Sequence, residues 1–215
     1  MKIYACSSNP AKLKELIFAG AASGLPDLVI EPLPGLRNVP TPEEDGHTFE
    51  ENAVKKAVYY SDLARDFVVA DDSGLEAFAL DGAPGIYSAR YAGPNATDAA
   101  NNNLLLSQLQ HAPDRRARFV CVIALARAGK LWTTVHGSVE GEILRLPRGD
   151  AGFGYDPLFF YPPWHRTFAE LTLEEKFGVS HRGNALRALF KWVSACKPMS
   201  PHPPLRSDSA PTPTS

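Results

Sequence analysis

Two adjacent aspartates, Asp71 and Asp72, follow the apolar run "VVA" and precede Ser73 and Gly74. Valine and alanine in succession predict a strand that is buried on both faces, and two carboxylates at its end repel each other. If the pair is partly desolvated, each pKa rises, which favours a cation, a shared proton or a hydrogen-bonding role in a turn. Asp, Ser and Gly are also turn formers, so this stretch alone leaves a solvated turn and a chemical site both open.

A second candidate site lies in "SSNPAKLK", residues 7–14. The helix predicted after Asn9 carries Lys12 and Lys14 in its first turns, where the helix dipole favours acids. A negatively charged group is therefore expected beside these two lysines. Backbone N–H groups, two serine hydroxyls and Lys12 together indicate a phosphate cradle, with solvated lysines as the alternative. The stretch matches neither the P-loop nor the dinucleotide-binding pattern.

An acidic cluster, Glu43 to Asp45, precedes a predicted helix that carries Asn52 and Lys56 on one face. Acids before a helix by themselves indicate capping. Together with Asp72 and the phosphate-suited loop, however, they are the residues needed to hold Mg²⁺ on a polyphosphate, because Mg²⁺ takes only one or two protein carboxylates. A spare aspartate would then orient or deprotonate water.

A third group comes late in the chain, in "FGYD" (153–156), Lys176 and "SHR" (180–182). A Phe beside glycines can stack on a flat ring, and Arg and His can donate to a carbonyl oxygen. Taken singly, Phe153 reads as core packing, Lys176 as a solvated residue and His181 as a helix-end cap. Jointly these residues indicate a pocket for a nucleobase.

The elements that must position these residues follow an α/β pattern. Strand 2–6, a helix with Asn9 as N-cap, and strand 28–33 form a strand–helix–strand opening. Further helices are predicted at 48–66 with a Thr48–Glu51 capping box, at about 98–109, and in two pieces capped by Thr172 and Ser180. Further strands are predicted at 117–126, 130–138 and 139–146, and these could extend away from the main sheet as a second lobe.

Composition bounds the class of protein. A chain of 215 residues with 44% hydrophobic and 21% charged residues fits one large or two small globular domains. A net charge of -2, a pI near 6.3 and the lack of a basic patch argue against nucleic acid and acidic membranes as partners. The three widely spaced cysteines indicate reduced thiols. With no apolar signal segment and no stretch as long as a membrane span, we expect a cytoplasmic protein.

The chain changes character near its end. From Lys197 onward it consists largely of Pro, Ser and Thr with almost no apolar residues, a composition that does not form a packed core. We therefore predict a folded domain at 1–196 and a disordered tail at 197–215.

Six motifs closely resemble, in order and spacing, the inosine/xanthosine triphosphate pyrophosphatase family, which removes non-standard purine nucleotides. They are "SSNPAKLKEL", "TFEENAVKKA", "ADDSGLEA", "GAPGIYSARYAG", "GFGYDPLFF" and "LTLEEKFGVSHRGNAL". The match runs from about residue 2 to residue 194. It implies an α/β fold with a central mixed sheet flanked by helices, a second smaller lobe and an active-site cleft between the lobes. It also implies a homodimeric, Mg²⁺-dependent enzyme that splits ITP, dITP or XTP into the monophosphate and pyrophosphate.

The resemblance also assigns residues. Asp72 falls on the family's general base, and Glu43 and Asp72 fall on its metal positions. The positions that would bind substrate are Ser7, Ser8, Asn9, Pro10, Ala11, Lys12, Lys56, Ser73, Phe153, Gly154, Tyr155, Asp156, Lys176, His181 and Arg182. Ser8 and Ala11 stand where the family often has Gly or another small or polar residue. On this hypothesis Asp72 faces metal and water, while Asp71 secures the turn and the local charge.

Selectivity would follow from donors and acceptors. Arg182 and His181 can donate to the 6-keto oxygen of hypoxanthine or xanthine, whereas the amino group of adenine leaves them unpaired. GTP would have to be refused elsewhere. The alternatives are a related pyrophosphatase with a different base preference and a non-catalytic nucleotide sensor. An aspartyl-phosphate phosphatase is disfavoured, because that chemistry usually places a second acid two residues after the nucleophile, where Gly74 stands.

Overall fold

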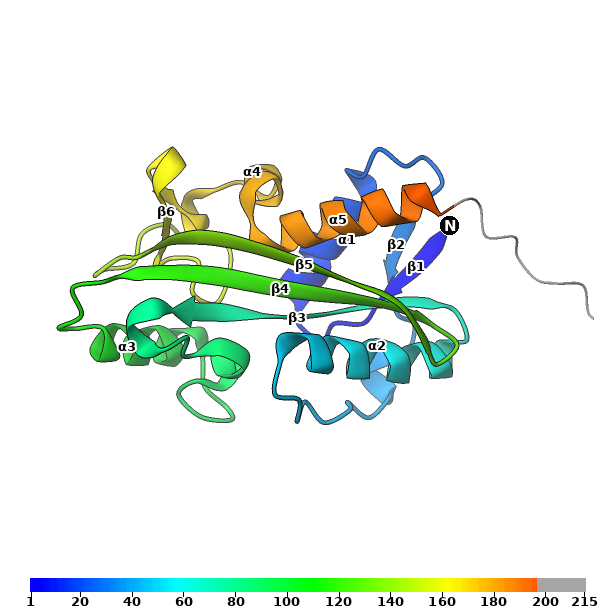
Figure 1. Ribbon diagram of the computed structural model, residues 1–215, viewed down its shortest axis with the longest axis horizontal. Helices are drawn as coiled ribbons and strands as arrows, with labels where there is room; N and C mark the ends of the chain where they lie inside the picture. The colour runs from blue at the N-terminus through cyan, green and yellow to red at the C-terminus, as the bar shows by residue number, and fades with distance from the viewer. Residues whose placement is uncertain (197–215) are drawn as a thin grey trace, which may run out of the picture.

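A computed structural model describes residues 1–196, which contain one seven-stranded sheet of order β2-β1-β3-β4-β5-β6-β7 (Figure 1). β1 pairs in parallel with β2 and β3, and the remaining neighbours are antiparallel, so the sheet is mixed as predicted. The strands are β1 (Lys2–Ala5), β2 (Val29–Pro32), β3 (Phe67–Ala77), β4 (Arg116–Arg127), β5 (Lys130–Ile143), β6 (Phe159–Tyr161) and β7 (Arg166–Thr167). The predicted tail at 197–215 lies outside the described residues.

Helices pack on both sides of the sheet. In Figure 1, α1 and α5 lie on one side of the long strands and α2 lies on the other, while α3 lies near the far end of β3. The helices are α1 (Pro10–Ala21), α2 (Phe49–Ala64), α3 (Asp98–Gln108), α4 (Leu173–Val179) and α5 (His181–Ala195). This arrangement confirms the predicted α/β class.

The predicted helix caps are present. Asn9 Oδ1 accepts from the N–H groups of Ala11 (2.9 Å) and Lys12 (3.2 Å), and Thr48 Oγ1 accepts from Glu51 N–H (3.1 Å). These bonds satisfy N–H groups that the first helical turn leaves free. The capping box at Thr48 is only half formed, because the Glu51 carboxylate accepts from His47 N–H (2.7 Å).

The interpretation of "DDSG" as a turn is wrong. β3 runs through it to Ala77 and pairs with β4 along its whole length, with Asp71 opposite Ile123 and Asp72 opposite Val122. The side chains of both aspartates are buried. Pairing with a long partner strand therefore overrides the local turn preference of these residues.

The predicted break between strands 130–138 and 139–146 is also absent. β5 runs from Lys130 to Ile143 without interruption. Gly137 lets α5 approach this strand, since a Cβ there would lie 2.2 Å from the backbone oxygen of His181. The glycine in the middle of the strand thus serves close helix packing and does not end the strand.

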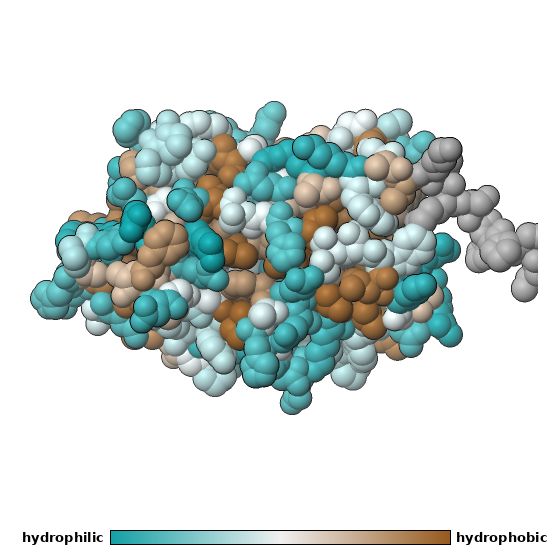
Figure 2. Space-filling view, viewed as in Figure 1, coloured by the Kyte–Doolittle hydropathy of each residue, from teal (hydrophilic) through white to brown (hydrophobic). Residues whose placement is uncertain are grey.

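Three groups of buried side chains accompany the sheet. One lies between the sheet and α1 and α5, one lies under α2, and the third joins the far part of β3 to α3 and β6. In Figure 2, hydrophobic side chains form separate patches in the central part of this face, with hydrophilic side chains between and around them. β3, β4 and β5 link all three groups in one sheet, and a separate second lobe with a cleft stays a prediction. Within residues 1–196, no helix combines the length and apolar character needed to span a membrane.

Candidate active site

Asp71 and Asp72 point to opposite faces of β3, because successive side chains of a strand alternate. Val69 belongs to the buried group under α1 and α5, and Val68 belongs to the group under α2. Asp71 continues the face of Val69, and Asp72 continues the face of Val68. The repulsion expected between neighbouring carboxylates is therefore reduced by placing each among different partners.

The pair stands just beyond the carboxyl end of β1. β1 ends at Ala5 beside Val69, whereas β3 continues for several residues. The chain leaves β1 at this point and passes through Ser7 to Asn9 into α1. The carboxyl ends of parallel strands, where the adjoining loops meet, are where α/β sheets form ligand sites.

Cations surround Asp71. Its Oδ2 accepts from Arg182 Nη2 (3.0 Å) and Ser73 Oγ (3.2 Å), and Lys12 Nζ lies 3.2 Å away. Burial alone would raise the pKa of Asp71, but Lys12 and Arg182 outweigh it and hold the pKa below its ordinary value. Asp71 is therefore a fixed negative charge.

Asp72 has a different setting. Its Oδ2 accepts from Asn52 Nδ2 (3.2 Å) and its Oδ1 accepts from Lys56 Nζ (3.3 Å). Burial raises the pKa of Asp72, with Glu44 and Asp71 adding to the effect and Lys56 opposing it. Neighbouring carboxyl groups whose pKa values are moved in opposite directions are a recurring sign of acid–base roles.

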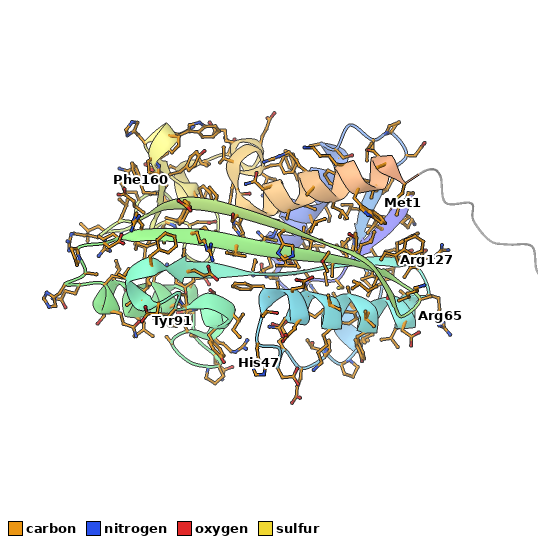
Figure 3. The ribbon with its side chains drawn as sticks, in the orientation of Figure 1. Met1, His47, Arg65, Tyr91, Arg127 and Phe160 are labelled. Atoms are coloured by element: carbon orange, nitrogen blue, oxygen red, sulfur yellow. The ribbon has the colours of Figure 1, made fainter. Side chains whose placement is uncertain are left out.

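The acidic loop reaches this site through Glu44. Glu44 Oε1 lies 3.1 Å from Lys56 Nζ, and the Glu44 backbone oxygen accepts from Arg90 (3.4 Å). Glu43 is exposed, and among the described contacts it has no hydrogen bond or ion pair. In Figure 3, His47 marks this loop at the start of α2 and Tyr91 marks the segment of Arg90.

A second charge group lies next to Asp71. Lys176 Nζ is 2.7 Å from Glu15 and also donates to Asp156, while Arg182 pairs with Glu15 through Nη1. Burial would raise the pKa of Glu15, but Arg182 and Lys176 lower it further than burial raises it. Phe153 lies over these cations, with its ring centroid 4.7 Å from Lys176 Nζ. The predicted base-pocket residues therefore do come together.

Arg182 is more constrained than its predicted role suggests. It is 1% exposed, and all three of its nitrogens donate to partners in the protein, namely Asp71, Glu15 and Ser73. Its first function in this structure is to hold the carboxylates of Asp71 and Glu15. A contact with a base would have to share these donors.

His181 offers a free polar atom. It is buried, and its Nδ1 has no partner among residues 1–196. Burial, with the positive charges of Arg182 and Lys176, lowers the pKa of His181 well below 6.5, so the ring is neutral. It stacks on Phe119, at 4.6 Å between centroids. An unpaired buried nitrogen in a stacked, neutral ring is suited to form a hydrogen bond with a ligand.

The predicted phosphate loop is partly occupied by its own cap. Asn9 already binds the N–H groups of Ala11 and Lys12, and Lys12 extends to Asp71. Ser8 and Pro10 are exposed, and Ser7 is half-buried. The hydroxyls and the Lys12 ammonium group are thus the groups best placed to meet a phosphate.

Tyr155 and Gly154 support the base-pocket loop through other contacts. Tyr155 is buried and its hydroxyl donates to the backbone oxygen of Ser88 (2.9 Å). Gly154 is held by α3, since its N–H donates to Asp98 (2.6 Å) and its oxygen accepts from Asn102 (3.0 Å). These contacts fix the backbone that follows Phe153.

Three residues of the site were missed or given no role by the sequence interpretation: Glu15, Glu44 and Asn52. Glu15 lies one turn after Lys12, and an acid among helical lysines was a signal that it faces the same site. Residues 1–196 contain no group of three or more acids, cysteines or histidines suited to a metal. Mg²⁺ on a polyphosphate needs only one or two carboxylates, and Asp72 with Glu44, which share Lys56, fit that requirement.

Comparisons with known proteins show the family of this chain. Residues 3–192 match the model of the Ham1 family. The chain belongs to the Ham1 family. A curated Ham1 relative from Exiguobacterium sp., named dITP/XTP pyrophosphatase, is 50% identical over 189 residues, covering 88% of this chain and 95% of the relative. Another with that name, from Syntrophobacter fumaroxidans, is 55% identical over 165 residues, covering 73% and 71%.

Solved Ham1 structures share the fold. The Staphylococcus aureus Ham1 protein superposes with a TM-score of 0.80 at 41% identity, covering 92% of this chain and 100% of that protein. A HAM1 protein from Coxiella burnetii gives a TM-score of 0.79 at 44% identity, covering 90% and 98%. The Ham1 fold therefore extends over nearly all of the described residues.

Proposed function

We propose that this chain hydrolyses the non-standard purine nucleotides ITP, dITP and XTP to the monophosphate and pyrophosphate, and so cleanses the nucleotide pool. The names of its Ham1 relatives support the reaction and the substrate class. The structural observation that carries the proposal is the placement of two neighbouring carboxylates among different partners, with Asp71 held by Lys12 and Arg182 and Asp72 held by Lys56 and Asn52. One acid supplies fixed charge and the other can exchange a proton.

Asp72 acts as the general base. It takes a proton from water as the water oxygen bonds to phosphorus and the α–β phosphoanhydride bond breaks, which releases pyrophosphate without a covalent intermediate. Lys56, 3.3 Å from Asp72, opposes the effect of burial on the pKa of Asp72 and so favours the charged carboxylate that accepts the proton. Its ammonium group is also proposed to bind a phosphate oxygen of the substrate.

Mg²⁺ is the proposed cofactor, held by Asp72 and by a carboxylate of the acidic loop. When bound, it would neutralise phosphate oxygens as charge develops. The resemblance places Glu43 in this role, and Glu44 stands beside it with its carboxylate on Lys56. The residues from Ser7 to Lys12, with Ser73, bind the remaining phosphate oxygens through hydroxyls and the ammonium group.

The base is proposed to lie against Phe153, within the loop of Gly154, Tyr155 and Asp156. His181, whose Nδ1 is unpartnered among residues 1–196, reads the 6-keto edge, and Arg182 and Lys176 supply the positive field behind it. The amino group of adenine would leave this nitrogen without a matching partner, at a large cost in rate.

Residues 1–196 are proposed to form the catalytic domain of a cytoplasmic homodimer. The family match over residues 3–192 supports the extent of the domain. Purine nucleoside triphosphates are the proposed partners, and nucleic acid and membranes are not.

The test of the reaction is product release from ITP, dITP, XTP, ATP and GTP with Mg²⁺, with pyrophosphate and orthophosphate assayed separately. Pyrophosphate from the first three alone is expected. Orthophosphate would contradict the cleavage site, and tight binding without turnover would make the protein a nucleotide sensor.

Asp72→Asn tests the general base. Asn keeps the shape but accepts no proton, so we expect kcat to fall on the order of 100-fold or more, with the melting temperature close to wild type. Asp62→Asn, an exposed acid near the end of α2 and away from the acidic loop, is the matched control and should keep its rate. Near wild-type turnover by Asp72→Asn would rule out this role.

A further inference from the structure

Asn52 connects the acidic loop to Asp72, and both ends of its amide are engaged. Nδ2 donates to Oδ2 of Asp72 (3.2 Å), and Oδ1 accepts from the N–H of Gly46 (2.9 Å). Asn52 is 1% exposed, so water does not compete for either bond. Neither bond stabilises α2 itself, since both partners lie outside the helix.

The bond to Gly46 fixes which way the amide faces. A backbone N–H can only donate, so it takes the oxygen of Asn52 and leaves the NH₂ group for Asp72. The other oxygen of Asp72 accepts from Lys56 (3.3 Å). Two residues on the same face of α2 therefore hold the two carboxylate oxygens separately, which sets the plane of the carboxylate.

Gly46 provides the space for this arrangement. A Cβ at residue 46 would lie 2.6 Å from Oδ1 of Asn52 and 2.8 Å from Cβ of Glu51. Any side chain there would displace either the amide or the loop. The contact between the loop and the Asn52 amide is thus made by the backbone of Gly46. The same loop places the Glu44 carboxylate beside Lys56.

We propose that Asn52 is a positioning residue for hydrolysis: its amide orients the Asp72 carboxylate toward the attacking water and holds residues 43–46 against it. The inference rests on the proposed function, in which Asp72 is the general base. Without this amide the carboxylate plane is set by Lys56 alone, and the productive orientation is occupied less often. The base and phosphate contacts lie on other residues, so at saturating Mg²⁺ the effect falls on kcat and leaves nucleotide binding intact.

Asn52→Leu has a similar shape and neither donor nor acceptor. We expect its kcat with dITP to fall on the order of 100-fold. Calorimetry at saturating Mg²⁺ with an α,β-methylene analogue of ITP should give nearly wild-type affinity for the analogue. Asn101→Leu is the matched control, because Asn101 is also a buried helical amide, bonded to the backbone of Ala89 (3.3 Å) and Ala92 (2.8 Å), and it should keep the wild-type kcat.

Gly46→Ala displaces the same amide without substituting any residue of α2. It should reproduce the loss of kcat. The kcat of the double variant should be no lower than that of the more impaired single variant, because both changes break the same connection. The proposal is overturned if either single variant keeps the wild-type kcat. It is also overturned if the losses of kcat multiply in the double variant, or if analogue affinity falls as much as kcat does. If Asn52→Leu does not fold, Gly46→Ala alone decides. Wild-type turnover of dITP is measured first, and its absence would count against the proposed function and not against Asn52.

Discussion

Asp71 and Asp72 have the same chemistry, and their different properties come from the alternation of a strand. One step along β3 moves a carboxylate from the layer of Lys12 and Arg182 to the layer of Lys56. The first group lowers the pKa against burial, whereas the second does not fully offset burial. At the scale of single residues, the site is therefore defined by which face of the sheet each side chain occupies.

The acidic loop allows a comparison of two neighbouring carboxylates. Glu44 contacts Lys56 and Glu43 is exposed, so we expect Glu44→Gln to raise the Mg²⁺ concentration needed for half-maximal turnover, on the order of 10-fold more than Glu43→Gln does. Mg²⁺ titrations of the two variants under saturating dITP measure this. A larger effect of Glu43→Gln would return the metal role to Glu43.

His181 should make stability depend on pH. Burial lowers its pKa well below the ordinary 6.5, so below that pH the unfolded chain binds a proton that the folded protein does not. The contribution is complete above pH 6.5 and is lost as the pH falls, by at most about 1.4 kcal/mol per pH unit. Urea unfolding of the wild type and of His181→Gln, at several pH values on both sides of 6.5, should show their stability difference shifting in favour of the variant at low pH. A constant difference would contradict a neutral buried ring.

At the scale of elements, local signals predicted helix starts well because the signals are local interactions. Asn9, Thr48, Thr97, Thr172 and Ser180 each accept a hydrogen bond from the first turn of their helix. The strand through "DDSG" was missed because its support comes from β4, about fifty residues later in the chain. No short window of sequence contains that pairing.

α3 should influence substrate affinity through the loop that it holds. Asn102 binds the backbone oxygen of Gly154, so Asn102→Leu frees the loop that carries Phe153. We expect the KM for dITP to rise about fivefold, the worth of one hydrogen bond, with kcat little changed. Asn103→Leu, an exposed position on the same helix, is the control. A fall in kcat at unchanged KM would show that the loop acts on the chemical step.

At the scale of the whole molecule, the α/β class and the mixed sheet could be predicted from the sequence. The three groups of candidate site residues could be named from the sequence, and their roles stay predictions. The partners within each group could not be predicted. Arg182 meets Asp71 across 111 positions of the chain and Glu15 across 167, and only the folded sheet brings them together. The sequence interpretation accordingly assigned Arg182 to the base and gave Glu15 no role.

Because the site draws on α1, α2, β3, α4 and α5, its ligand should stabilise the protein as a unit. A ligand that binds only the folded state at about 100 times its Kd adds about 2.7 kcal/mol. For a domain of this size, that corresponds to a rise in melting temperature of roughly 5–10 °C. Thermal unfolding with Mg²⁺ and the α,β-methylene analogue of ITP measures it, with the matching ATP analogue as control. Equal shifts with both analogues would contradict selection by the base.

The continuity of β3, β4 and β5 limits how the protein can open for a nucleotide. These strands of 11, 12 and 14 residues are paired nearly end to end, and a hinge across them would break ladder hydrogen bonds in two places at once. The three strands consequently form a rigid support that connects both ends of the molecule. We therefore expect nucleotide entry and release to depend on the segments attached to these strands, namely residues 6–9, 40–48 and 149–156.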